Sequence, residues 1–179
     1  GGGVIGVEMA QILSAFGSST YVSVQREDVV AKIGEVIGAI HAEGALSGMH
    51  CCGNTEWSIP VDAGVKIVNF DAYQYGETVA LYPEHLRRHL VENGNALAWG
   101  IVPTSSAIRQ VTAADLADTY EKLADHLSKK AGIDKALIAR KAFITPSCGT
   151  GSMEPRDAER VFEVLAETSR TLKARYGFH

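Results

Sequence analysis

Apolar residues recur along the chain in two patterns, one typical of amphipathic helices and the other typical of short strands. Helical spacing of the apolar side chains predicts helices over residues 28–43, 83–92, 112–130, 134–140 and 152–175. Short apolar runs predict strands over residues 45–50, 66–71, 96–102 and 142–145, the first of them buried. Glycine or proline follows most of these segments, which is typical of the ends of helices and strands.

The alternation of strands and helices predicts an α/β fold with a parallel sheet that helices cover. Four strand–helix units follow one another, each of about the length typical of a unit in a TIM-type (β/α)8 barrel, and such a barrel needs eight units. The chain is therefore expected to form half of a barrel. Half a barrel exposes two sheet edges and part of its apolar interior, so we expect it to form a homodimer, to pair with the missing half-barrel, or to aggregate.

Several residues within the predicted elements are expected to have structural roles only. Trp57 and Trp99 are expected to pack in the core. Ser152 is expected to cap the last helix, with Pro155 in its first turn. Four histidines on predicted helices are expected to be solvated: His41, His85, His89 and His126.

Composition and charge narrow the function classes. Hydrophobic residues make up 46% of the 179 residues and charged residues 21%, as in one domain with a sizeable core. With a net charge of −4 and no basic stripe, nucleic acid is not an expected partner. The chain has neither a run of apolar residues long enough for a membrane span nor the pattern of a secretory signal, so no membrane association is expected. The three cysteines, two of them adjacent, favour free thiols in the reducing cytoplasm.

Candidate metal ligands lie where the predicted strands end. His50 and Cys52 are two residues apart, so in an extended segment both side chains point to the same face, whereas Cys51 points away. Cys148 follows the last strand, and the ends of parallel strands converge on the active site of a barrel. Imidazole and thiolate groups are zinc ligands, and Asp71 is expected either to supply an oxygen or to orient His50.

Two other interpretations of these residues remain open at this point. A single cysteine is most often a small buried hydrophobic residue, and a histidine near the end of a strand is often a hydrogen-bonded structural residue. A catalytic cysteine–histidine pair is the other alternative, although no third residue that would orient the histidine stands out.

Three segments carry a resemblance to a known family: residues 50–54 (His-Cys-Cys-Gly-Asn), 69–73 (Asn-Phe-Asp-Ala-Tyr) and 145–149 (Thr-Pro-Ser-Cys-Gly). From about residue 12 to residue 178 the chain resembles the C-terminal half of the barrel of cobalamin-independent methionine synthase. The relatives of that enzyme include uroporphyrinogen decarboxylase and corrinoid-dependent methyltransferases. The resemblance implies the C-terminal half of a TIM-type barrel, with residues 12–179 as a partial methionine synthase-like domain.

The resemblance also implies a site and an activity in methionine biosynthesis. His50, Cys52 and Cys148 match zinc ligands of the methionine synthases, whereas Asp71 stands where the family has a glutamate ligand. The implied enzyme is a zinc-dependent methyltransferase that moves a methyl group from a folate or a methylcorrinoid to a thiol such as homocysteine. Catalysis is expected to rest on the zinc site alone, and Glu77 and Ser147 are the candidate substrate-binding residues.

The first eleven residues do not fit this family. Residues 9–11 are Met-Ala-Gln where the family has Asp-Glu-Pro, whose aspartate helps to hold the substrate. Gly1, Gly3 and Gly6 instead form a Gly-x-Gly-x-x-Gly pattern that resembles the nucleotide-binding loop of pyridine nucleotide–disulfide oxidoreductases. That loop needs a preceding strand, so a glycine-rich helix end is the simpler interpretation. Residues 1–11 are therefore expected to be a foreign segment, and the alternative functions are a nucleotide-binding oxidoreductase fragment and a non-catalytic zinc-binding remnant.

Overall fold

The computed structural model describes residues 25–178 of the chain. The foreign segment predicted over residues 1–11, with Gly1, Gly3 and Gly6, lies outside these residues. The strands are β1 (Gly48–Cys51), β2 (Ile67–Phe70), β3 (Ala96–Val102) and β4 (Ala142–Pro146). The α-helices are α2 (Arg26–Ala42), α3 (Ser58–Asp62), α4 (Ala72–Tyr75), α5 (Pro83–Arg87), α6 (Ala113–Ala131), α7 (Lys135–Arg140) and α8 (Pro155–Tyr176). Shorter helical turns are η1 (Thr78–Leu81), η2 (Arg88–Glu92) and η3 (Ser106–Arg109).

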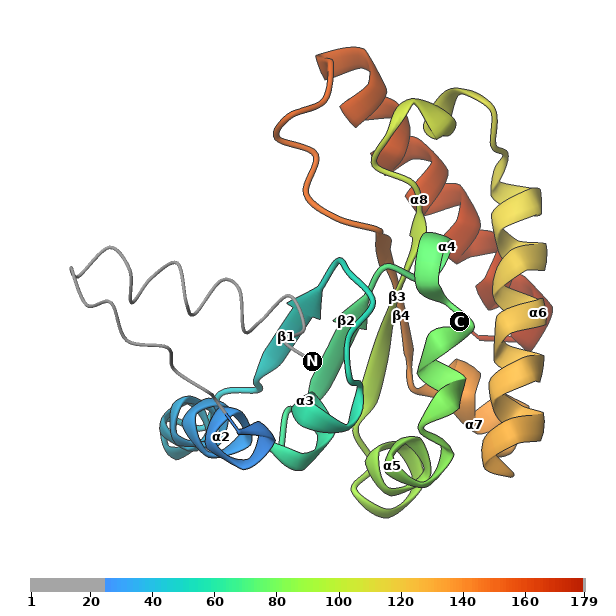
Figure 1. Ribbon diagram of the computed structural model, residues 1–179. Helices are drawn as coiled ribbons and strands as arrows, with labels where there is room; N and C mark the ends of the chain where they lie inside the picture. Colours follow the sequence, from blue (N-terminus) through green and yellow to red (C-terminus); the bar gives the residue numbers. More distant parts are fainter. Residues whose placement is uncertain (1–24, 179) are drawn as a thin grey trace.

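The four strands form one parallel sheet in the order β1-β2-β3-β4, and helical segments connect them (Figure 1). The predicted α/β class with a parallel sheet is therefore confirmed. All four strands end at the same edge of the sheet, which we call the carboxyl edge. No helix within residues 25–178 combines the length and the apolar character that a membrane span requires.

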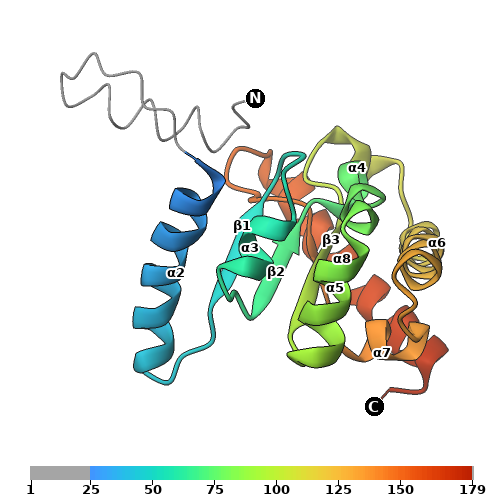
Figure 2. The same cartoon turned by 60° about the horizontal axis from the view of Figure 1, so that its bottom comes forward.

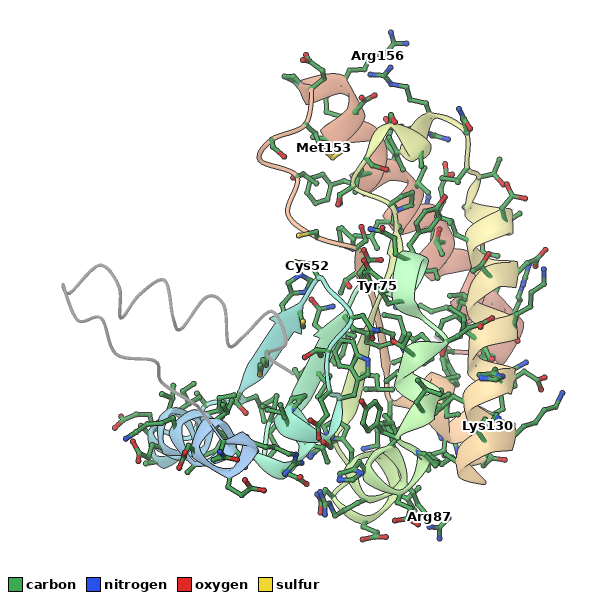
Figure 3. The ribbon with its side chains drawn as sticks, in the orientation of Figure 1. Cys52, Tyr75, Arg87, Lys130, Met153 and Arg156 are labelled. Carbon is green, nitrogen blue, oxygen red and sulfur yellow. The ribbon has the colours of Figure 1, made fainter. Side chains whose placement is uncertain are left out.

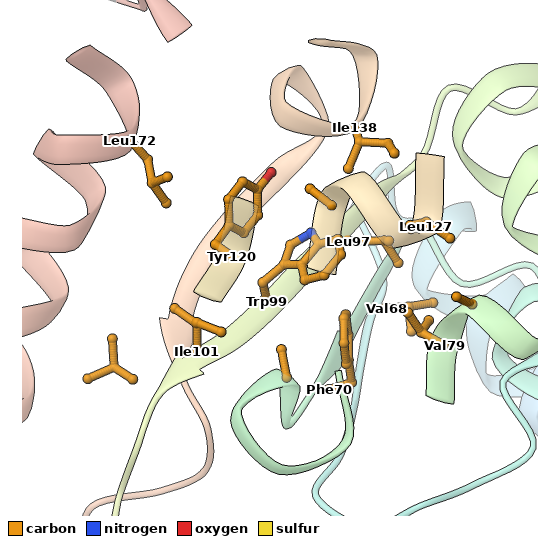
Figure 4. Close-up of a cluster of buried hydrophobic side chains, with 14 of the residues drawn as sticks. Val68, Phe70, Val79, Leu97, Trp99, Ile101, Tyr120, Leu127, Ile138 and Leu172 are labelled. Atoms are coloured by element: carbon orange, nitrogen blue, oxygen red, sulfur yellow. The ribbon is translucent and has the colours of Figure 1, made fainter. Parts of the chain in front are cut away.

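One face of the sheet carries the apolar core. Phe70 of β2 and Trp99 of β3 point to this face, where their ring centroids lie 5.1 Å apart. Trp57 packs on Phe70 and Tyr120 of α6 packs on Trp99, at 5.5 and 5.2 Å between ring centroids. All four rings belong to the buried core cluster, of which Figure 4 shows Phe70, Trp99 and Tyr120. Both tryptophans take the packing role that the sequence predicted.

The opposite face of the sheet includes small and polar residues. Successive side chains of a strand alternate between faces, so His50, Asn69 and Ala98, which pair in register, share this second face. Phe143 of β4 lies on the same face and is 53% exposed. The predicted burial of the first strand is wrong, because β1 is an outer strand whose second-face residue His50 is exposed, while Met49 packs half-buried against the core.

The ends of the long helices follow local rules, with one correction. Thr112 and Asp115 form a reciprocal capping box at the start of α6. Gly132 ends that helix in the left-handed conformation, at φ 62°. Helix α8 begins with Pro155 in its first turn, but its N-cap is Glu154, so the prediction that Ser152 caps this helix is wrong. The helix predicted over residues 83–92 divides into α5 and the wider π-helical turn η2.

The prediction of solvated helical histidines is wrong for His89, which is fully buried. Its Nε2 lies 3.0 Å from the carbonyl oxygen of Ala96, the first residue of β3. Burial lowers the pKa of His89 and outweighs the opposing effect of that hydrogen bond, so the ring is a neutral structural group. His41, His85 and His126 are half-buried.

Candidate metal centre

His50, Cys52 and Cys148 come together at the carboxyl edge of the sheet. One ring nitrogen of His50 and the sulfur atoms of Cys52 and Cys148 all lie within 4.8 Å of one another. His50 is in β1, Cys52 follows that strand directly, and Cys148 follows β4. All three side chains are exposed. Figure 3 shows Cys52 at the carboxyl end of β1, below the connection that leads to Met153.

The connection from β4 to α8 makes this meeting possible. Since β1 and β4 are the outer strands, three spacings of about 4.8 Å separate them across the sheet. Cys148 bridges this separation because the segment after β4 runs along the carboxyl edge toward β1 before α8 begins, as both views show (Figures 1 and 2). A group of ligands thus forms from residues that are distant in the sequence and lie in or just after two non-adjacent strands.

A hydrogen-bonded asparagine supports His50 from the neighbouring strand. The Nδ1 atom of His50 lies 2.6 Å from Oδ1 of Asn69. The amide nitrogen of Asn69 donates to the carbonyl oxygen of Ala98 at 2.9 Å and to Oγ1 of Thr145 at 3.0 Å. This chain of contacts links all four strands beneath the ligand group.

The cysteines of the chain are free thiols, and two of them face each other. Burial raises the pKa of the Cys52 thiol, and the neighbouring Cys148 raises it further. A cation between the two sulfurs would reverse this effect, because it favours the thiolates. Cys51 points to the helix-covered face, where it packs against the core, and its Sγ lies 3.5 Å from the carbonyl oxygen of Gly53. The expectation that Cys51 points away from the site is met.

Asp71 is not brought into the ligand group. It is buried, and it is the N-cap residue of α4. One carboxylate oxygen accepts a hydrogen bond from the backbone N–H of Gln74 at 2.9 Å, and the other accepts from the side-chain amide of Gln74 at 2.7 Å. Asn69, and not Asp71, contacts the ring of His50.

The two candidate substrate-binding residues occupy different environments. Glu77 is exposed just after α4, where its side chain makes no capping hydrogen bond. Ser147 is 4% exposed, and its hydroxyl oxygen accepts from the backbone N–H of Thr104 and contacts Oγ1 of Thr104, each at 3.1 Å. Ser147 therefore ties the end of β4 to the end of β3.

Asn69 belongs to the site, although no motif in the sequence assigned it a role. The signal that marks it is a single polar residue within the apolar run of β2. Gly100 of β3 also belongs to this region, because an added Cβ would lie 2.5 Å from the carbonyl oxygen of Phe70 and 2.9 Å from Cα of Ser147. A side chain at this position would force the strands apart next to the site.

The donor set determines what the arrangement can hold. One imidazole nitrogen and two sulfurs at this separation could hold one metal ion. Nitrogen and sulfur donors in a tetrahedral set are the usual ligands of zinc, and a set of three leaves a fourth position for an exchangeable ligand. Because the three residues are exposed, a small molecule can reach that position from solvent.

No family model, curated protein or solved structure matches the chain in the comparisons with known proteins.

Proposed function

We propose that the chain carries the zinc site of a methyltransferase of the methionine synthase type, which transfers a methyl group to a thiol. The observation that carries this proposal is the convergence of His50, Cys52 and Cys148 within 4.8 Å at the carboxyl edge of the sheet. These are the three residues that the family resemblance assigns to zinc. The compartment that fits free thiols of this kind is the cytoplasm.

The chemistry of the donors suits thiol alkylation. A bound zinc ion lowers the pKa of a thiol that coordinates it, so the substrate is held as the nucleophilic thiolate at neutral pH. His50, Cys52 and Cys148 would supply the imidazole nitrogen and the two thiolates that hold zinc, and a ligand set of three would leave a position for the substrate sulfur. Methyl transfer then forms a carbon–sulfur bond and breaks the bond between the methyl group and its donor. The bonding electrons stay with the donor, which is a folate or a corrinoid.

We also propose that the sheet is one half of a TIM-type barrel. The strand order β1-β2-β3-β4 never reverses, which is typical of a barrel, whereas doubly wound sheets change direction at a switch point. The ligand group lies at the carboxyl edge, where barrel enzymes have their active sites. The second face, with the exposed Phe143, corresponds to the interior of the barrel.

A half-barrel should not stay monomeric when its second face and outer strands are free. Sedimentation velocity of the purified chain is expected to show a dimer or larger species over a tenfold range of concentration. Replacing the exposed Phe143 by lysine is expected to shift the distribution toward monomer, since this side chain lies on the face that pairing would cover. A stable, monodisperse wild-type monomer would contradict the half-barrel proposal.

The activity is tested with the zinc-loaded chain, homocysteine, and either methylcobalamin or a methylated folate as donor. Mass spectrometry of the products is expected to detect S-methylated homocysteine only when zinc is present. The matched control is the chain with Cys52→Ser and Cys148→Ser, which lacks both sulfur ligands. If the chain bound one zinc ion but methylated neither homocysteine nor other small thiols, the proposed methyltransferase activity would be overturned. The chain would then be a non-catalytic zinc-binding remnant.

A further inference from the structure

We propose that Asn69 is a positioning residue, which holds His50 in the tautomer that presents Nε2 to the metal ion. This inference rests on the proposed metal site and adds a residue that neither the ligand motif nor the family resemblance assigns. It is carried by three contacts of one side-chain amide, at 2.6, 2.9 and 3.0 Å.

The orientation of the Asn69 amide follows from its partners. A backbone carbonyl oxygen can only accept a hydrogen bond, so the atom 2.9 Å from the carbonyl oxygen of Ala98 must be the amide nitrogen. The same nitrogen has a second proton for Oγ1 of Thr145. The amide oxygen is therefore the atom that faces His50.

This orientation determines where the proton of His50 lies. Oδ1 of Asn69 can only accept, so Nδ1 of His50 must be the donor across the 2.6 Å contact. A neutral imidazole with its proton on Nδ1 has a lone pair on Nε2. The asparagine thus selects the nitrogen that is free to bind metal, in the way that outer partners of histidine ligands usually do.

The register of the strands places Asn69 where its amide oxygen can accept the hydrogen bond from His50. His50 and Asn69 face each other in the register of β1 and β2, and Asn69 pairs in turn with Ala98 of β3. The small side chain of Ala98 leaves room for the asparagine to reach Thr145 of β4 across the second face. Because two partners on two other strands fix the amide, its oxygen is aimed at His50 before any metal binds.

The test is metal affinity and spectroscopy, measured without any methyl donor. Competition of the apoprotein with a chromophoric chelator gives the zinc affinity, and Co²⁺ gives the absorption spectrum of the ligand set. Asn69→Leu is expected to weaken zinc binding by about 10–100-fold, the usual loss when the partner of a histidine ligand is removed. Asn69→Asp keeps an acceptor for the Nδ1 proton but loses the donor to the carbonyl oxygen of Ala98, so it is expected to lose less affinity than Asn69→Leu.

Histidine-selective ¹⁵N NMR of the apoprotein provides the second readout. The wild type is expected to carry the proton of His50 on Nδ1, and Asn69→Leu is expected to move population to the Nε2-protonated tautomer. The matched control is Asn95→Ala, which removes an asparagine near His89 at the start of β3. It is expected to lower the stability without changing the affinity for zinc or the spectrum of bound Co²⁺.

The outcomes separate this inference from the function on which it rests. Wild-type affinity and tautomer in Asn69→Leu would overturn the positioning role while leaving the metal site intact. Equal losses in Asn69→Leu and Asn69→Asp would also overturn it, because the asparagine would then act only through the fold. A wild-type chain that binds neither Zn²⁺ nor Co²⁺ would overturn the metal site itself.

Discussion

Replacing Cys148 by serine is expected to lower the zinc affinity of the chain by more than about 100-fold, because loss of an outer partner already costs about 10–100-fold and this change removes a ligand. A serine hydroxyl stays protonated at neutral pH and cannot replace a thiolate. The same loss is expected for Cys52→Ser, since the two sulfurs face one another across the group. Chelator competition with the apoprotein measures both effects.

The adjacent cysteine provides the control for this prediction. Cys51 is a free thiol next to Cys52, but it packs against the core and lies outside the ligand group. Cys51→Ser is therefore expected to keep the zinc affinity of the wild type within about threefold, well below the loss for a ligand or its partner. If Cys51→Ser lost zinc while Cys148→Ser retained it, the assignment of the ligands would be wrong.

Truncating Trp99 to alanine is expected to lower the free energy of unfolding by about 3–5 kcal/mol. The indole is fully buried in the middle of β3 and contacts the rings of Phe70 and Tyr120, so its removal opens a cavity between the sheet and α6. Urea denaturation followed by circular dichroism measures the change and avoids a signal that depends on tryptophan.

Trp99→Phe is the matched variant for this position. It keeps an aromatic ring between Phe70 and Tyr120 and removes the indole N–H, which has no hydrogen-bond partner among the described residues. Its loss of stability is therefore expected to be well below that of Trp99→Ala, because no buried hydrogen bond is broken. A Trp99→Ala variant within about 1 kcal/mol of the wild type would show that this ring cluster is not the core of the fold.

Much of the fold could be predicted from the sequence, because local patterns determine it. The strand at Ala96–Val102 was predicted with the bounds that the structure has, since a continuous apolar run is typical of a strand buried on both faces. The start of α6 after its N-cap Thr112 was also predictable, because a capping box needs only two residues three positions apart.

The errors in the fold concern properties that depend on distant parts of the chain. The first strand was expected to be buried, but it is an outer strand in the described sheet, and its position there is not encoded in its own apolar residues. His89 was expected to be solvated, but the π-helical turn η2 brings it under the start of β3, where Ala96 and Asn95 contact it. Neither the sheet order nor that contact follows from spacing along the chain.

In the candidate site, too, local sequence predicted some features, whereas others depend on distant parts of the chain. The two-residue spacing placed His50 and Cys52 on one face. The convergence of strand ends made Cys148 a candidate, and the family resemblance assigned it as a ligand, because the path of the segment after β4 cannot be read from the sequence. Asp71 was the expected partner of His50, but Asn69 contacts the ring instead, and the reason lies in where β2 ends. Asn69 is still within β2 and pairs in register with His50, whereas Asp71 lies past the strand, where the chain turns into α4 and uses the carboxylate as a cap.

X-ray absorption spectroscopy of the zinc-loaded chain tests the assignment of His50, Cys52 and Cys148 as zinc ligands, because it reports the atoms bound to the metal. We expect a four-coordinate zinc ion with two protein sulfurs at about 2.3 Å and a histidine nitrogen at about 2.0 Å. The sulfur shell should disappear when Cys52 and Cys148 are both replaced by serine. A zinc ion surrounded only by oxygen and nitrogen in the wild type would show that Cys52 and Cys148 are not its ligands.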